Sequence, residues 1–113
     1  MDTKDSKVWV RDVFDRAAPC YGAKGCTYFD AFGAQLVALA QLQPGEQILD
    51  VATGKGAVLF PASQVVGELG TAIGIDLSPA MIEEAKKRHP HSSARLLVMD
   101  AERLLFPSHS FDV

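Results

Sequence analysis

The sequence predicts an α/β fold with a doubly wound parallel sheet, preceded by N-terminal helices. Three short apolar runs, 47–52, 71–76 and 95–100, alternate with segments of helical character. Near-continuous apolar runs are typical of strands buried on both faces of a parallel sheet. Alternation of strands with helices predicts right-handed crossovers between those strands. With 113 residues, 48% of them hydrophobic, the chain can bury one modest core.

The first 45 residues predict a helical cap in front of the sheet domain, which we place at 46–113. Residues 7–18 carry apolar side chains at helical spacing with charged residues between them, which indicates an amphipathic helix. A loop over 20–27 follows, because glycines and a proline interrupt the pattern there. A second helix is expected over 28–42. Its apolar stripe, expected to be core or a lid, includes Phe29, Phe32 and Leu36.

Two crossover helices are predicted between the strands. The first, over 57–66, contains Pro61, so we expect a kink or a late start there. In the second, Ser78 is the expected cap and Pro79 the first helical residue. Four-apart ion pairs, Glu83 with Lys87 and Glu84 with Arg88, are expected to stabilise that second helix.

An aspartate stands at or near the end of each predicted strand: Asp50, Asp76 and Asp100. Because the carboxyl ends of parallel strands share one edge, we expect the three carboxylates to face one crevice, where open α/β sheets bind ligands. After the first strand, Gly54 and Gly56 form a turn that opens into a helix and lets backbone approach a ligand closely.

The pattern suits a nucleoside cofactor without phosphates. Asp76 follows the glycine turn by about 20 residues, the offset at which a carboxylate accepts hydrogen bonds from ribose hydroxyls. Leu59 stands where the dinucleotide fingerprint requires a third glycine or alanine. An acidic crevice also favours a positively charged ligand over a pyrophosphate. S-adenosylmethionine, with a sulfonium, an ammonium and a ribose diol, meets these conditions.

Four segments resemble, in order and spacing, the motifs of class I S-adenosylmethionine-dependent methyltransferases: 48–56, 74–82, 99–102 and 106–113. The opening at 13–19, together with Tyr21, is loosely similar to the ubiquinone and menaquinone biosynthesis methyltransferases. The resemblance implies a Rossmann-like fold with S-adenosylmethionine as cofactor. It also implies an N-terminal fragment, since the chain ends where the family's fourth strand begins.

The resemblance assigns the methionine end of the cofactor to four residues. Gly54 and Gly56 would let the turn lie against the methionine, and Asp50 would hold that turn or reach the ammonium through a water. Tyr21 would close over the same end. Ala52 stands where the fuller motif often has a third glycine, which would make the turn slightly less open.

Five further positions are assigned by the resemblance to the adenosine half. Asp76 would accept hydrogen bonds from both ribose hydroxyls, and Leu77 and Met81 would pack against the adenine. Asp100 would accept from the exocyclic amine, and the backbone of Ala101 would contact the ring.

The expected function is methyl transfer to a small-molecule acceptor, with the chain holding most of the cofactor half. No catalytic base or metal ligand set is assigned. A nicotinamide-dependent oxidoreductase half-domain and a non-catalytic cofactor-binding scaffold stay open as alternatives. Loss of a fourth strand would leave the first strand as an apolar edge, so we also expect self-association.

Composition excludes other classes of function. The chain has 11 basic and 14 acidic residues, a net charge of −3, and no basic run that would follow a nucleic-acid backbone. The longest apolar stretch is shorter than the roughly 20 residues of a membrane span. No secretory leader is recognisable and only two cysteines are present, so we expect a cytoplasmic protein.

Overall fold

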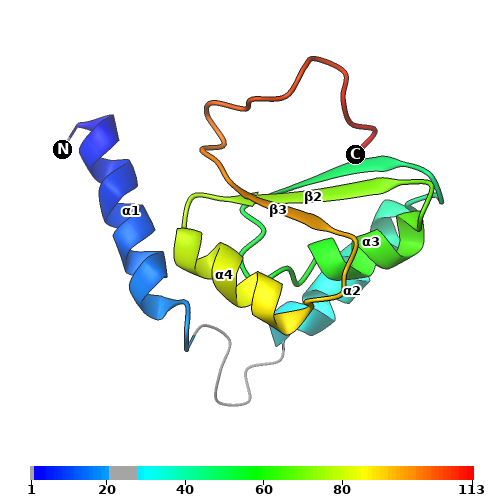
Figure 1. Cartoon of the computed structure of the whole chain (residues 1–113), viewed down its shortest axis with the longest axis horizontal. Coiled ribbons are helices and arrows are strands. Elements are labelled where there is room, and N and C mark those ends of the chain that lie inside the picture. Colours follow the sequence, from blue (N-terminus) through cyan, green and yellow to red (C-terminus); the bar gives the residue numbers. More distant parts are fainter. Residues whose placement is uncertain (1, 21–27) are drawn as a thin grey trace.

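The computed structural model describes residues 2–20 and 28–113 (Figure 1), and the predicted alternation of strands and helices is confirmed within them. The elements are α1 (Thr3–Ala17), α2 (Tyr28–Ala40), β1 (Gln47–Val51), α3 (Leu59–Val66), β2 (Thr71–Asp76), α4 (Pro79–Arg88) and β3 (Arg95–Val98). The predicted loop lies mostly outside the described residues, as does Tyr21.

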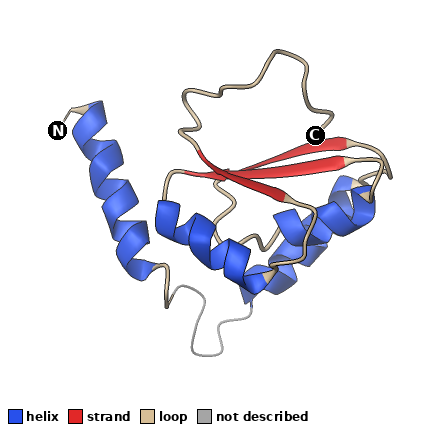
Figure 2. Cartoon of the chain, viewed as in Figure 1, coloured by secondary structure: helices blue, strands red, loops and turns tan. Residues whose placement is uncertain are grey.

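The three strands are parallel and follow the order β1-β2-β3. Figure 2 shows α3 and α4 on one face of this sheet, as two right-handed crossovers that progress in the same direction require. The prediction of strands buried on both faces is wrong for β3, where Leu97 and Val98 are 41% and 52% exposed. The loop that follows β3 is drawn on the side of the sheet away from the helices (Figure 1).

The last residues reverse the direction of winding. The backbone N–H of Val113 donates to the Gln47 carbonyl at 3.3 Å, and its carbonyl accepts from Leu49 N–H at 2.9 Å. This is the parallel ladder pattern, formed on the β1 edge that faces away from β2. The predicted parallel α/β sheet is confirmed over β1-β2-β3, and the return of the chain to the outer edge of β1 is what a doubly wound order requires. The expected open edge of β1 is instead hydrogen-bonded along Gln47–Leu49, which corrects that part of the self-association argument.

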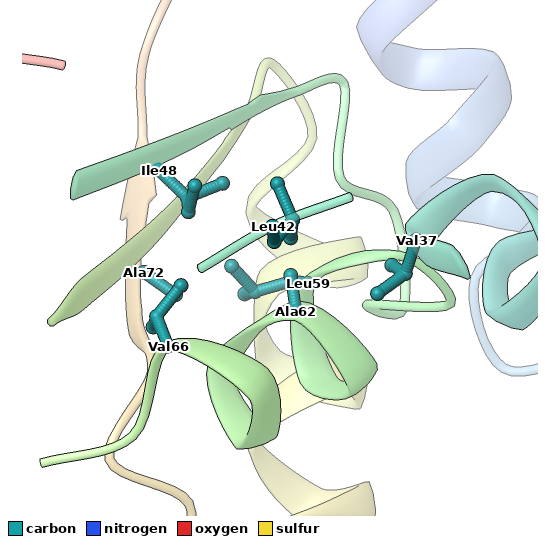
Figure 3. Close-up of a cluster of buried hydrophobic side chains, with 7 residues drawn as sticks. All are labelled: Val37, Leu42, Ile48, Leu59, Ala62, Val66 and Ala72. Atoms are coloured by element: carbon teal, nitrogen blue, oxygen red, sulfur yellow. The ribbon is translucent and has the colours of Figure 1, made fainter. Parts of the chain in front are cut away.

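The late start predicted for the first crossover helix is confirmed. Helix α3 begins at Leu59, so Pro61 lies in the first turn, where backbone N–H groups have no intrahelical partner to lose. Leu59, Ala62 and Val66 then face the sheet. They join a buried cluster drawn in Figure 3 whose other members are Val37, Leu42, Ile48 and Ala72.

Helix α2 docks through a different face from the one expected. Gly33 and Val37 are buried, and a Cβ added to Gly33 would lie 2.1 Å from the Ala57 carbonyl oxygen. Phe32 and Leu36 of the expected stripe are exposed instead, at 63% and 54%, whereas Phe29 is half-buried. The core role is therefore wrong for Phe32 and Leu36, because glycine permits a close backbone approach that larger side chains on the other face prevent; the lid role stays a prediction.

The start of α4 is as predicted, but its ion pairs are not. Ser78 is the N-cap and accepts from the backbone N–H of Met81 at 3.1 Å. The lysines pair three residues back, Lys86 with Glu83 at 3.8 Å and Lys87 with Glu84 at 3.4 Å. Arg88 reaches α2, where it pairs with Asp30 at 2.9 Å. Across the described ranges no helix is both long and apolar enough to pass through a bilayer.

Candidate functional site

A cavity of about 550 Å³ lies between α1 and the carboxyl ends of β2 and β3. Figure 1 shows α1 standing at that end of the sheet, beside α4. Its sheet-side wall contains Ala52, Gly54, Ile75, Asp76, Leu77, Ser78, Met81, Met99, Asp100, Ala101 and Glu102. The facing wall is α1, which contributes Thr3, Ser6, Lys7, Val10, Arg11 and Phe14.

Asp76 is held at both carboxylate oxygens by backbone from two different turns. Oδ2 accepts from Gly54 N–H at 2.8 Å, and Oδ1 accepts from Ser78 N–H at 2.9 Å. A carboxylate has about four acceptor positions. Asp76 therefore keeps acceptor positions for a diol while its orientation is fixed by the protein.

Asp50 lies beneath the glycine turn and does not line the cavity. Its Oδ2 accepts from the hydroxyl of Thr53 at 2.7 Å. Burial raises the pKa of Asp50 above its ordinary value, the hydrogen bond from Thr53 opposes that rise, and the charge of Asp76 adds to it. The contact with Thr53 is the one expected of a residue that holds the turn, and contact with the ammonium through a water stays a prediction.

The turn after β1 uses left-handed backbone at three positions: Ala52 at φ 58°, Gly54 at 55° and Gly56 at 86°. Thr53 ties the turn to β2, because its N–H donates to the Ile75 carbonyl at 2.9 Å. A Cβ on Gly56 would lie 2.2 Å from the Phe60 ring. Gly56 therefore allows the turn to pack on α3, whereas Gly54 lines the cavity.

Asp100 is paired with a cation that the sequence analysis did not assign. Lys7 Nζ lies 2.6 Å from Asp100 Oδ2 and 2.6 Å from Glu102 Oε2. The hydrogen bond from Lys7 holds the pKa of Asp100 below its usual range, and the same bond raises the pKa of Lys7. The Glu102 N–H donates to the other oxygen of Asp100 at 3.0 Å.

Six of the nine predicted site residues line the cavity: Gly54, Asp76, Leu77, Met81, Asp100 and Ala101. Asp50 and Gly56 do not line it, and Tyr21 falls outside the described residues. The predicted acidic crevice is a mixed one, since Lys7 and Arg11 line it together with three carboxylates. Within 2–20 and 28–113, no cluster of side chains has the composition of a metal site.

Sequence reasoning missed the wall that α1 provides. The only local signal was amphipathicity, and both Val10 and Phe14 of the predicted apolar face line the cavity. The charged residues between them gave no indication that Lys7 reaches a carboxylate 93 positions away. Such a contact is decided by how the helix is placed on the domain.

Comparisons with known proteins identify relatives of this chain. A model of the family described as "Methyltransferase domain" matches residues 48–113. The chain is 40% identical to aklanonic acid methyltransferase DauC of Streptomyces sp. (strain C5) over 116 residues, which are 100% of this chain and 53% of that protein. It is 32% identical to a demethylmenaquinone methyltransferase of Symbiobacterium thermophilum over 118 residues, 96% of this chain and 47% of that protein. The chain thus spans about half the length of these curated relatives.

One solved structure matches almost the entire chain. Phosphoethanolamine N-methyltransferase 1 of Haemonchus contortus, in complex with phosphoethanolamine and S-adenosylhomocysteine, superposes with a TM-score of 0.76. The match covers 99% of this chain and 25% of that one at 15% identity. A likeness at this level of identity establishes the shared fold.

Proposed function

We propose, because this chain belongs to the methyltransferase domain family, that it binds S-adenosylmethionine in the cavity between α1 and the ends of β2 and β3. S-adenosylmethionine is the cofactor of the family. The orientation of Asp76 carries the proposal. Its carboxylate lines the cavity with both oxygens fixed and with acceptor positions left for two hydroxyls.

The residues present fit this cofactor and disfavour a dinucleotide. Helix α3 begins with Leu59, at the position where the dinucleotide fingerprint needs a small residue. Lys7 offsets the charge of Asp100 and Glu102 in the cavity wall, so repulsion of a phosphate there would come chiefly from Asp76. A nucleoside that carries a sulfonium and no phosphate avoids that repulsion.

Different residues of the cavity would contact different parts of the cofactor. Asp76 would accept from the ribose hydroxyls, and Gly54 would bring backbone close to the methionine portion. Leu77 and Met81 would pack against the adenine, with Met81 only 1% exposed and thus fixed in the core. Asp100, held by Lys7, would have an acceptor position left for the exocyclic amine.

When bound, S-adenosylmethionine supplies a methyl group on a positively charged sulfur, which an acceptor nucleophile takes by in-line displacement. The protein's contribution is orientation, which can supply about 7–11 kcal/mol of barrier reduction without a protein nucleophile. We propose a small organic acceptor, as the names of the relatives aklanonic acid methyltransferase and demethylmenaquinone methyltransferase indicate for those proteins. We also propose that residues 1–45 form a helical cap on a sheet domain at 46–113.

Calorimetric titration of the chain with S-adenosylhomocysteine tests the proposal, with NAD as the comparison ligand. We expect saturable binding of S-adenosylhomocysteine and none of NAD. Asp76→Asn should weaken binding by about tenfold or more, because a hydrogen bond to a charged group is worth ~1.5–3 kcal/mol. The matched control is Asp30→Asn, which removes a carboxylate that pairs with Arg88 on the surface. Equal affinity for NAD, or no effect of Asp76→Asn, would contradict the proposal.

A further inference from the structure

We infer that Asp15, on α1, is a positioning residue for cofactor binding: it fixes the Ser78 turn that orients Asp76. Asp15 lies outside the segment 48–113 that the family model matches. It does not line the cavity. The inference rests on the proposed function and adds a residue to it.

Asp15 forms two contacts with the start of α4, which is 63 residues away in sequence. Its Oδ1 accepts a hydrogen bond from the hydroxyl of Ser78 and another, at 3.2 Å, from the backbone N–H of Ala80. The first N–H groups of a helix have no intrahelical acceptor, and a carboxylate placed there is favoured by the helix dipole. Asp15 therefore adds to the cap that Ser78 provides.

The hydroxyl of Ser78 is oriented by this contact. It donates to Asp15 and accepts from the backbone N–H of Met81 at 3.1 Å. Ser78 is 1% exposed, so water does not substitute for either partner. If Asp15 were removed, the hydroxyl would need a different acceptor inside the fold, and the turn would lose the partner that fixes its direction.

Ser78 passes this constraint to Asp76. Its backbone N–H donates to Asp76 Oδ1 at 2.9 Å, while Gly54 holds Oδ2 at 2.8 Å. The plane of the carboxylate is thus set by two turns, and one of them is anchored by Asp15. Residues that support a binding group in this way maintain it in the geometry that the ligand needs.

The test is a double-mutant cycle on binding of S-adenosylhomocysteine, with Asp15→Ala, Asp76→Ala and the double variant. We expect Asp15→Ala to weaken binding roughly tenfold, and to have little further effect once Asp76 is already alanine, because coupled neighbours are not additive. Asp15→Asn retains an oxygen acceptor and should restore most of the affinity. Asp5→Ala is the matched control, since Asp5 is an exposed carboxylate on the same helix.

A second ligand separates positioning from general damage to the fold. The analogue of S-adenosylhomocysteine that lacks both ribose hydroxyls should bind Asp15→Ala and the unmodified chain equally well. If Asp15→Ala weakened both ligands by the same factor, or retained its effect in the Asp76→Ala background, the inference would be overturned. If the unmodified chain bound no S-adenosylhomocysteine, the proposed function itself would fail, which is a distinguishable result.

Discussion

Replacement of Thr53 by valine tests the account of the glycine turn most directly. Valine has nearly the same shape but lacks the hydroxyl, which donates to Asp50 Oδ2 at 2.7 Å. Thr53 is 6% exposed, so water cannot readily replace that donor. Loss of a hydrogen bond to a charged group costs about 1.5–3 kcal/mol. We therefore expect Thr53→Val to lower the free energy of unfolding by about that amount.

Urea denaturation followed by circular dichroism measures the effect. With a slope of about 1–3 kcal/mol per molar urea for a small domain, the midpoint should fall by roughly 1 M. Thr53→Ser is the control, because it keeps the hydroxyl and loses one methyl group, at a cost of ~1 kcal/mol. Affinity for S-adenosylhomocysteine should also fall in Thr53→Val, since Thr53 lies next to Gly54 in the turn.

The loss of stability in Thr53→Val should depend on pH through the ionisation of Asp50. Burial already raises the pKa of Asp50, and the hydrogen bond from Thr53 opposes that rise. Without the hydroxyl the pKa of Asp50 should rise further, and a raised carboxyl pKa means that stability falls as pH increases through it. The deficit of Thr53→Val should therefore shrink on acidification, as Asp50 becomes protonated. A deficit that is absent, or that is the same at every pH, would refute the reasoning.

Three further predictions follow from other contacts. Gly74→Ala would place a Cβ 2.7 Å from Thr53 Oγ1. This overpacking should lower the free energy of unfolding by about 1–3 kcal/mol in the same urea assay. A urea midpoint equal to that of the unmodified chain would contradict it. Lys7→Met should remove the pairing that lowers the pKa of Asp100; the unmodified chain gains stability from this pair above the unfolded pKa of Asp100 and loses it as pH falls through the folded pKa. The free energies of unfolding of the two proteins, measured as a function of pH, should therefore converge at low pH. A difference that stays constant with pH would contradict the pairing. Exposed apolar surface, including Leu39 at 80%, predicts self-association, and a clean monomer in light scattering after size exclusion would count against it.

Features with a local cause were predictable from the sequence. Ser78 and Pro79 marked the start of α4 because a capping hydroxyl and a fixed φ act within one turn. Pro61 predicted a late start of α3, because proline is tolerated only in the first turn of a helix. Asp76 was found because the end of a parallel strand places its side chain at the edge where ligands bind.

Features that depend on docking between distant elements could not be predicted. Helix α2 is apolar on two faces, and the sequence does not state which one packs; Gly33, more than the large side chains, marks the buried face. The pairing of Lys7 with Asp100 depends on the angle at which α1 crosses the sheet edge. Asp50 was expected either to hold the glycine turn or to reach the ligand through a water; its carboxylate accepts from Thr53 and does not line the cavity, which its strand position alone did not indicate.

The doubly anchored carboxylate of Asp76 also determines when its conformational entropy is lost. Backbone N–H groups of Gly54 and Ser78 immobilise the side chain as the protein folds. A ribose that binds as proposed would meet an acceptor that is already oriented, so affinity would not be reduced by freezing that side chain. Asp76 would then discriminate by geometry, because a rigid carboxylate does not turn toward a sugar whose hydroxyls point elsewhere.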